Sequence, residues 1–132
     1  MNGFLNDASI NFADKEYRES YAEEFLDLWI AAQIRALREQ RTWTQEALAE
    51  RAGMRQSRIS ALEDAEYSSW SVNTLKRLAK AFDVTLVVEF RSYGKRLFDF
   101  ERFAKRDLEE PTFEDDGLFR TVVPSAGAGM HE

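Results

Sequence analysis

The stretch from Thr44 to Leu62 constrains the fold most, because its apolar and small residues recur at the spacing of two short helices joined by a tight turn. Gly53 falls in that turn, where glycine adopts a positive φ without steric cost. Ala49 falls where the two helices approach most closely, so a larger side chain would separate them. The other apolar positions are Leu48, Ala52, Met54, Ile59 and Leu62. The pattern predicts helices from Gln45 to about Ala52 and from Arg55 to about Glu63.

The second of these helices, which we call the reading helix, has polar, basic and small residues on the face that its apolar residues leave outward. They are Arg55, Gln56, Ser57, Arg58, Ser60 and Ala61. Arginine pairs with the guanine edge and glutamine with the adenine edge in the major groove of DNA. An exposed second helix of this kind is typical of a DNA-binding helix-turn-helix. We therefore expect Arg55 and Gln56 to carry most of the base recognition.

Charge is unevenly distributed along the 132 residues, whose net charge is −6. Residues 34–82 carry nine basic and six acidic side chains, whereas residues 1–33 carry two basic and seven acidic ones. Residues 83–110 are close to balanced, and residues 111–132 carry one basic and four acidic side chains. Because potentials decay over a Debye length of ~8–10 Å, the local sign decides whether a surface attracts DNA. The segment with the predicted DNA-binding helices is the net positive one.

Composition argues against several kinds of site. The chain has no cysteine, which excludes disulfides, thiolate zinc sites and cysteine nucleophiles, and its one histidine is His131. The paired carboxylates Glu109–Glu110 and Asp115–Asp116 have no predicted pocket around them. No apolar run approaches the ~20 residues of a membrane span. We also expect that no signal peptide precedes the fold. We expect a cytoplasmic protein that is not an enzyme and holds no metal or cofactor.

Helical patterns surround the motif. Residues from Lys15 to about Arg41 suit either one long helix capped by Asp14 or two helices with a restart at Ser20–Glu23. Ser71 caps a further helix that ends at Phe82, and residues 95–108 are predicted to be helical up to Pro111. The whole chain divides into 1–33 (N-terminal extension and acidic helix), 34–83 (DNA-binding domain), 84–110 (dimerisation strand and Phe-rich helix) and 111–132 (acidic, disordered tail).

Between these helices, the segment from Val84 to Tyr93 alternates apolar and other residues with a period of two, which predicts a β-strand. A lone strand leaves its backbone groups unpaired. The other segment of the chain that could form a strand and pair with it is the short stretch Ala8–Phe12. We therefore expect pairing with a second copy about a two-fold axis. The Phe-rich helix then covers the two-stranded sheet, or its phenylalanines pack within their own chain. The residues expected to mediate dimerisation are Val84, Leu86, Val88 and Phe90.

Residues Ile34 to Val84 resemble the lambda-repressor-like or Cro-like (Xre-type) helix-turn-helix family. The resemblance rests on the motifs I-R-A-L-R-E-Q-R-T-W-T-Q, L-A-E-R-A-G-M and S-R-I-S-A-L-E. It implies a mainly α fold with a five-helix core. The predicted strand resembles the dimerising strand of antitoxin repressors of the HipB type. The family often has glycine where this chain has Thr42, Ala65 and Asp83, so the loops are expected to differ there.

The resemblance also implies roles for single residues. Arg38 and Glu63 match an ion pair that ties the first helix to the reading helix. Gln45 matches a residue that meets a DNA phosphate at a helix N-terminus. The base-facing positions match Arg55, Gln56, Ser57 and Ala61. Further phosphate contacts are expected from Thr44, Arg58 and Ser60 and from the loop at Ser68 and Ser69.

These features together predict a sequence-specific regulator of transcription that binds double-stranded DNA, most simply a repressor that occupies a promoter. Two reading helices about 34 Å apart in a homodimer would match a palindromic operator. Two alternatives stay open. One is an antitoxin that regulates its own operon and binds a toxin through its termini. The other is a protein-interaction module without DNA binding.

Overall fold

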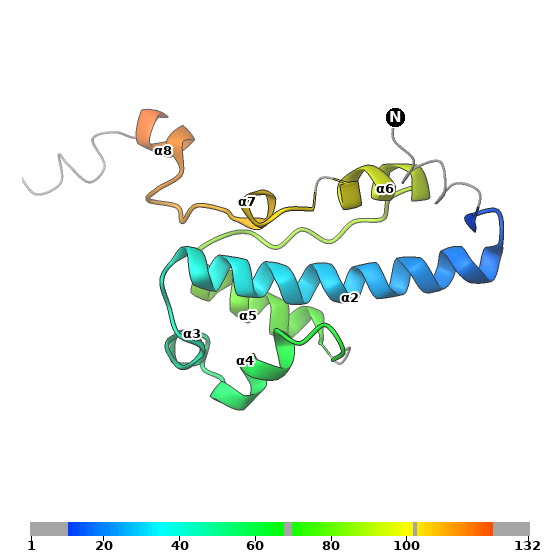
Figure 1. Ribbon diagram of the computed structural model, residues 1–132. Helices are drawn as coiled ribbons and strands as arrows, with labels where there is room; N and C mark the ends of the chain where they lie inside the picture. Colours follow the sequence, from blue (N-terminus) through cyan, green and yellow to red (C-terminus); the bar gives the residue numbers. More distant parts are fainter. Residues whose placement is uncertain (1–10, 68–69, 102, 123–132) are drawn as a thin grey trace, which may run out of the picture.

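The structure is a computed structural model that describes residues 11–67, 70–101 and 103–122. Within these residues the chain is helical and contains no β-strand (Figure 1). None of its helices is long and apolar enough to cross a membrane. The helices are α2 (Lys15–Gln40), α3 (Gln45–Ala52), α4 (Gln56–Leu62), α5 (Val72–Phe82), α6 (Tyr93–Glu101), α7 (Lys105–Leu108) and α8 (Gly117–Val122).

Helix α2 is one uninterrupted helix of 26 residues, which settles the choice between one helix and two. Asp14 occupies the N-cap position, although its side chain makes no capping hydrogen bond. Figure 1 shows α2 running through the molecule, with α3, α4 and α5 on one side of it and α6 and α7 on the other. One helix therefore serves two separate packing surfaces.

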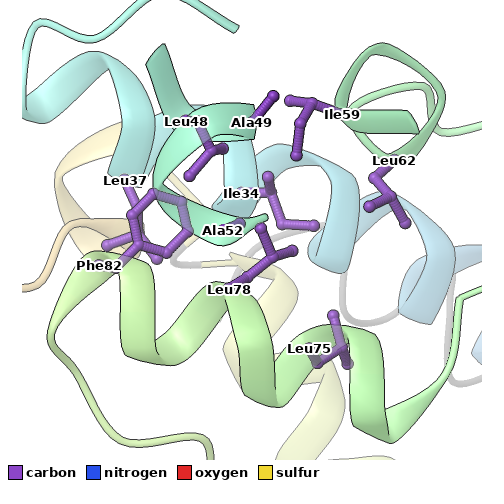
Figure 2. Close-up of a cluster of buried hydrophobic side chains, with 10 residues drawn as sticks. All are labelled: Ile34, Leu37, Leu48, Ala49, Ala52, Ile59, Leu62, Leu75, Leu78 and Phe82. Atoms are coloured by element: carbon purple, nitrogen blue, oxygen red, sulfur yellow. The ribbon is translucent and has the colours of Figure 1, made fainter. Parts of the chain in front are cut away.

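The main core lies where the second half of α2 meets α3, α4 and α5 (Figure 2). Phe82, Leu48 and Ile59 have the largest fully buried side chains. Of the apolar positions expected in the motif, Met54 alone is half-buried and the others are buried. Truncation of a buried leucine such as Leu48 to alanine typically costs ~2–5 kcal/mol, so this core fixes the relative positions of the helices. Its buried members are Ile34, Leu37, Leu48, Ala49, Ala52, Ile59, Leu62, Leu75, Leu78 and Phe82.

Three residues end helices or turns in the left-handed region. Gly53 has φ 68° and closes α3, and a Cβ there would lie 3.1 Å from the Arg77 guanidinium. Thr42 has φ 58° and Asp83 has φ 60°. The family that the chain resembles often has glycine at these two positions. Here Thr42 and Asp83 adopt the positive φ that glycine would adopt. Such a conformation is costly for a β-branched residue such as Thr42.

The predicted strand from Val84 to Tyr93 is wrong for this chain: residues 84–92 form an extended connector without strand pairing, and Tyr93 begins α6. Within the chain, Val84 N–H donates instead to the Ala79 carbonyl at the end of α5. The alternation predicted from the sequence arises because Val84 and Leu86 pack against the main core. The other expected partner strand, at Ala8–Phe12, lies largely outside the described residues. Val88 and Phe90 are exposed, by 69% and 103%.

The Phe-rich segment does not cover a sheet but packs against the first half of α2 in its own chain. The Phe100 ring lies 4.8 Å from that of Phe25, and the Phe103 ring lies 5.3 Å from that of Trp29. Arg96 places its guanidinium 4.5 Å from the Phe25 ring centre. The physical reason is that α2 extends past the main core, so its aromatic stripe needs a cover of its own. Phe98 stays exposed.

After α6 the chain returns along α2, and hydrogen bonds tie it down. Gln33 Nε2 donates to the Leu108 carbonyl at 3.1 Å, and Glu110 N–H donates to Gln40 Oε1 at 3.1 Å. Arg41 donates to the carbonyls of Phe82 (2.8 Å) and Glu110 (3.0 Å), and burial lowers the pKa of its guanidinium. The return segment therefore braces α2 on the side opposite α3 and α4. Of the expected disordered tail, residues 111–122 are described and contain α8, and residues 123–132 lie outside the described residues.

Candidate nucleic-acid interface

The turn between α3 and α4 is built from local capping. Thr44 Oγ1 accepts a hydrogen bond from Ala47 N–H at 3.0 Å, which starts α3. Gly53 ends α3 in the left-handed conformation, and Met54 N–H donates to the Ala49 carbonyl at 2.9 Å. Arg55 is the N-cap residue of α4, so the reading helix starts at Gln56, one residue later than expected.

One face of α4 is free to meet a ligand. Ile59 and Leu62 are buried in the core, which turns the opposite face outward. Arg55, Gln56, Ser57 and Ser60 are exposed, and Ala61 is half-buried. Figure 1 shows α4 on the side of the molecule away from α6 and α7. The structure thus groups the residues expected to face bases on one exposed surface.

The ion pair between Arg38 and Glu63 is present and nearly buried. Arg38 Nε lies 2.6 Å from Glu63 Oε2, and Arg38 Nη2 lies 3.0 Å from Glu63 Oε1. The two side chains are 12% and 5% exposed. Arg38 Nη1 also donates to the Trp43 carbonyl at 2.8 Å. The hydrogen bond to Glu63 raises the pKa of Arg38, so the pair joins α2 to the end of α4 as two charged partners.

Gln45 connects this ion pair to the reading helix. Its Nε2 donates to Glu63 Oε1 at 3.1 Å, and its Oε1 accepts from Gln56 Nε2 at 2.7 Å. The sequence predicts a phosphate contact for Gln45 and a base contact for Gln56, and the structure adds that the two side chains touch. No sequence signal could have shown this, because the contact spans 11 residues and two helices whose crossing geometry decides it.

Arg58 is half-buried and its guanidinium is hydrogen-bonded within the chain, whereas the resemblance implies a phosphate contact. Its guanidinium donates to the Tyr67 hydroxyl and, at 3.5 Å, to Thr74 Oγ1. It also lies 5.7 Å from the centre of the Tyr67 ring. The side chain thereby ties α4 to the segment before α5 and to α5 itself. Ser68 and Ser69, the other expected phosphate contacts in that segment, lie outside the described residues.

Two further arginines lie near the turn and were not singled out from the sequence. Arg77 on α5 donates to the carbonyl of Gly53. Arg51 on α3 lies 4.2 Å from the centre of the Trp43 ring. Both are exposed, and the Arg77 contact with Gly53 adds positive charge at the turn before the reading helix. The net charge of residues 34–82 was the signal that could have pointed to them.

The described part of the chain holds no group of three or more His, Cys, Asp and Glu side chains placed to bind a metal ion. In a comparison with protein families, residues 34–88 match the model described as "Helix-turn-helix". No curated protein matches the chain significantly, and no solved structure does. The matched segment runs from the second half of α2 through α5 into the extended connector.

Proposed function

Since residues 34–88 are a helix-turn-helix domain of the Xre and lambda-repressor-like family, we propose that the protein is a transcriptional regulator that recognises a specific double-stranded DNA sequence. The observation that carries this proposal is the exposed face of α4. The ion pair between Arg38 and Glu63 joins the end of this helix to α2. A reading helix must hold its side chains in one place to discriminate between bases. The nearly buried ion pair and the hydrogen bonds of Gln45 support that rigidity.

We assign base recognition to Arg55 and Gln56, with Ser57 and Ala61 beside them on α4. Phosphate contacts are assigned to Gln45 and Thr44 at the start of α3, where free N–H groups and the helix dipole favour an anion, and to Ser60. Arg58 is left out of this set because Tyr67 and Thr74 already hold its guanidinium. Base contacts specify the sequence, whereas phosphate contacts position the helix.

The finer proposal is a repressor that binds a palindromic operator as a homodimer. Its support is the extended connector, which carries exposed apolar side chains at Val87, Val88 and Phe90. Exposed apolar side chains on one short segment can pack against the same segment of a second copy around a two-fold axis. Two copies paired there would present two reading helices to two half-sites, and occupancy of a promoter would repress transcription.

An antitoxin function is a second candidate, on one specific observation. The first half of α2 extends past the matched domain, and Tyr17 and Leu26 on it are each 39% exposed. Five acidic residues surround them between Glu16 and Asp27. A basic partner protein would find complementary charge on this surface. Co-expression with the product of the neighbouring gene, followed by co-purification that Leu26→Lys abolishes, would support this function.

The decisive experiment starts from a randomised duplex library, from which the protein selects its preferred sites. Competition between a selected duplex and a scrambled duplex of equal composition is then measured at about 150 mM salt. We expect the selected duplex to bind at least ~10³-fold more tightly, as specific DNA-binding proteins do. Equal binding of the two duplexes would favour the protein-interaction module instead. Salt dependence alone does not decide the question, because it reports phosphate contacts.

A further inference from the structure

We propose that two copies of this chain associate through a groove between α5 and the connector (residues 84–92). Each copy inserts its Phe90 into the groove of the other, and Lys76 and Lys80 at the groove attract the partner's Glu89. The proposal rests on the proposed homodimer, and it adds the surface that receives the exposed side chains of the connector.

The groove is formed where the connector, which leads from the end of α5 to α6, folds back along α5 (Figure 1). Its volume is about 540 Å³. Pockets that bind ligands typically measure about 300–1,000 Å³, so the groove has room for an aromatic side chain. Most of the lining is apolar, which favours the burial of an apolar group. The lining includes Val72, Lys76, Ala79, Lys80, Leu86 and Val88.

Phe90 is the side chain of the connector best suited to fill this groove. It is 103% exposed, so its ring stays outside the groove of its own chain, although Val88 lines that groove two residues earlier. A buried phenylalanine side chain removes ~150–250 Å² from water. Together with Val87 and Val88, each 69% exposed, Phe90 forms an apolar patch that the single chain leaves in water. A second copy supplies the cover that its own chain does not.

The closeness of groove and anchor in the chain favours a symmetric pair of contacts. Val88 lines the groove and Phe90 follows two residues later. A two-fold axis that passes near Val88 therefore brings each Phe90 toward the groove of the other copy. Both contacts then form in the same dimer and use both grooves. The assembly closes at two chains, because neither copy keeps a free groove or a free anchor.

Charge at the groove matches the connector of a second copy. Lys76 and Lys80 lie one helical turn apart and are exposed, and neither forms an ion pair with a carboxylate of the described residues. Glu89 precedes Phe90 and its side chain is 54% exposed. Its contact with Arg91 is long, at 3.6 Å, and Arg91 also lies 3.5 Å from Asp99. Glu89 is thus free to approach the lysines of a partner when Phe90 enters the groove.

Charge exchange in the full chain tests the proposal. Lys76→Glu places a carboxylate opposite the partner's Glu89, and Glu89→Lys places an ammonium group opposite the lysines of the groove. Each variant alone should dimerise about tenfold more weakly in sedimentation equilibrium, because like charges meet. In an equimolar mixture of the two variants both contacts of the mixed dimer have opposite charges, so dimerisation should return close to wild-type strength. The matched control is Lys15→Glu, at an exposed position at the start of α2, which should keep the wild-type dissociation constant.

Thr85→Trp tests the groove by size rather than charge. Thr85 is exposed and lines the groove, so a tryptophan there occupies the space for Phe90. We expect dimerisation to weaken by at least about tenfold while urea unfolding of the single chain stays close to wild type.

Wild-type dimerisation in Lys76→Glu or in Thr85→Trp would overturn the proposal and leave the packing of two connectors against each other as the contact. A mixture that dimerises no better than its two components would overturn it as well. A wild-type chain that is monomeric at micromolar concentration would contradict the proposed homodimer itself, whereas the choice of DNA sequence is measured separately.

Discussion

Arg38 and Glu63 lie 25 residues apart in the sequence and meet in a two-point ion pair, with Arg38 Nε 2.6 Å from Glu63 Oε2. Since both side chains are nearly buried, removal of one partner leaves the other charge without compensation. We expect Arg38→Met to lower the free energy of unfolding by about 3 kcal/mol, measured by urea denaturation.

The double variant Arg38→Met with Glu63→Leu should be more stable than the sum of the two single losses predicts, because no buried charge remains. If the two losses simply add, the pair is not coupled in the way that its geometry indicates.

Gln56→Ala should relax base preference at one position of each half-site, at a cost of ~1–3 kcal/mol in discrimination. If Gln56 contacts one base edge as proposed, that contact is removed while the proposed phosphate contacts stay. Competition binding with the four base pairs at each position measures this change. Lys105→Ala, on the other side of α2, is the control and should leave the preference unchanged. A loss of affinity that is equal for all sequences would make Gln56 a positioning residue.

Arg58→Met should reduce stability rather than DNA affinity. Its guanidinium bonds with Tyr67 and Thr74 are lost, which we expect to cost about 1–2 kcal/mol in urea unfolding. Arg55→Met, at an exposed position, should change stability by less than ~0.5 kcal/mol and weaken DNA binding. A salt slope reduced by about one in Arg58→Met, at unchanged stability, would restore the phosphate role suggested by the resemblance.

Phe90→Asp should abolish self-association without affecting the fold of the single chain. Phe90 is fully exposed, so a charge there costs nothing in the monomer but disfavours pairing of two connectors. Light scattering during gel filtration at micromolar concentration measures the change. Leu118→Asp on α8 is the matched control, because Leu118 is similarly apolar and 62% exposed. A wild-type protein that is monomeric under these conditions would contradict the homodimer.

Thr42→Gly should stabilise the protein by roughly 0.5–1 kcal/mol. Thr42 has φ 58°, a conformation that costs a β-branched residue more than glycine, and its exposed side chain contributes little packing. Thermal unfolding measures the gain as a higher Tm. Thr44→Gly serves as the control, since Thr44 has φ −79° and caps α3, so the same change should not stabilise there. A lower Tm for Thr42→Gly would show that its hydroxyl matters more than its backbone.

Several features followed from the sequence because they depend on near neighbours in the chain. Gly53 predicted a left-handed turn, Thr44 and Ser71 predicted helix caps, and the structure has all three. The apolar spacing between Thr44 and Leu62 predicted which side chains of α3 and α4 are buried. Local sterics and helical periodicity suffice for such features, so no knowledge of distant residues is needed.

The connector and the Phe-rich helix could not be predicted in the same way. The alternation from Val84 to Phe90 predicts that every second side chain is buried. It does not indicate which part of the protein buries these side chains. In the structure the cover for Val84 and Leu86 is the main core, and the cover for Phe100 is α2. Which surfaces remain open depends on the whole packing arrangement. A periodic pattern therefore does not distinguish a strand from an extended segment on a helical core.

The sequence by itself determined that α3 and α4 form a helix-turn-helix with an outward face on α4, because helix period, caps and a glycine turn are local. The tertiary structure alone decided that Gln45 is hydrogen-bonded to both Glu63 and Gln56. It also decided that the Arg58 guanidinium is hydrogen-bonded to Tyr67. Hydrogen bonds between side chains of different helices depend on the distance and angle at which those helices pack. That geometry is set by the buried core as a whole rather than by any one segment.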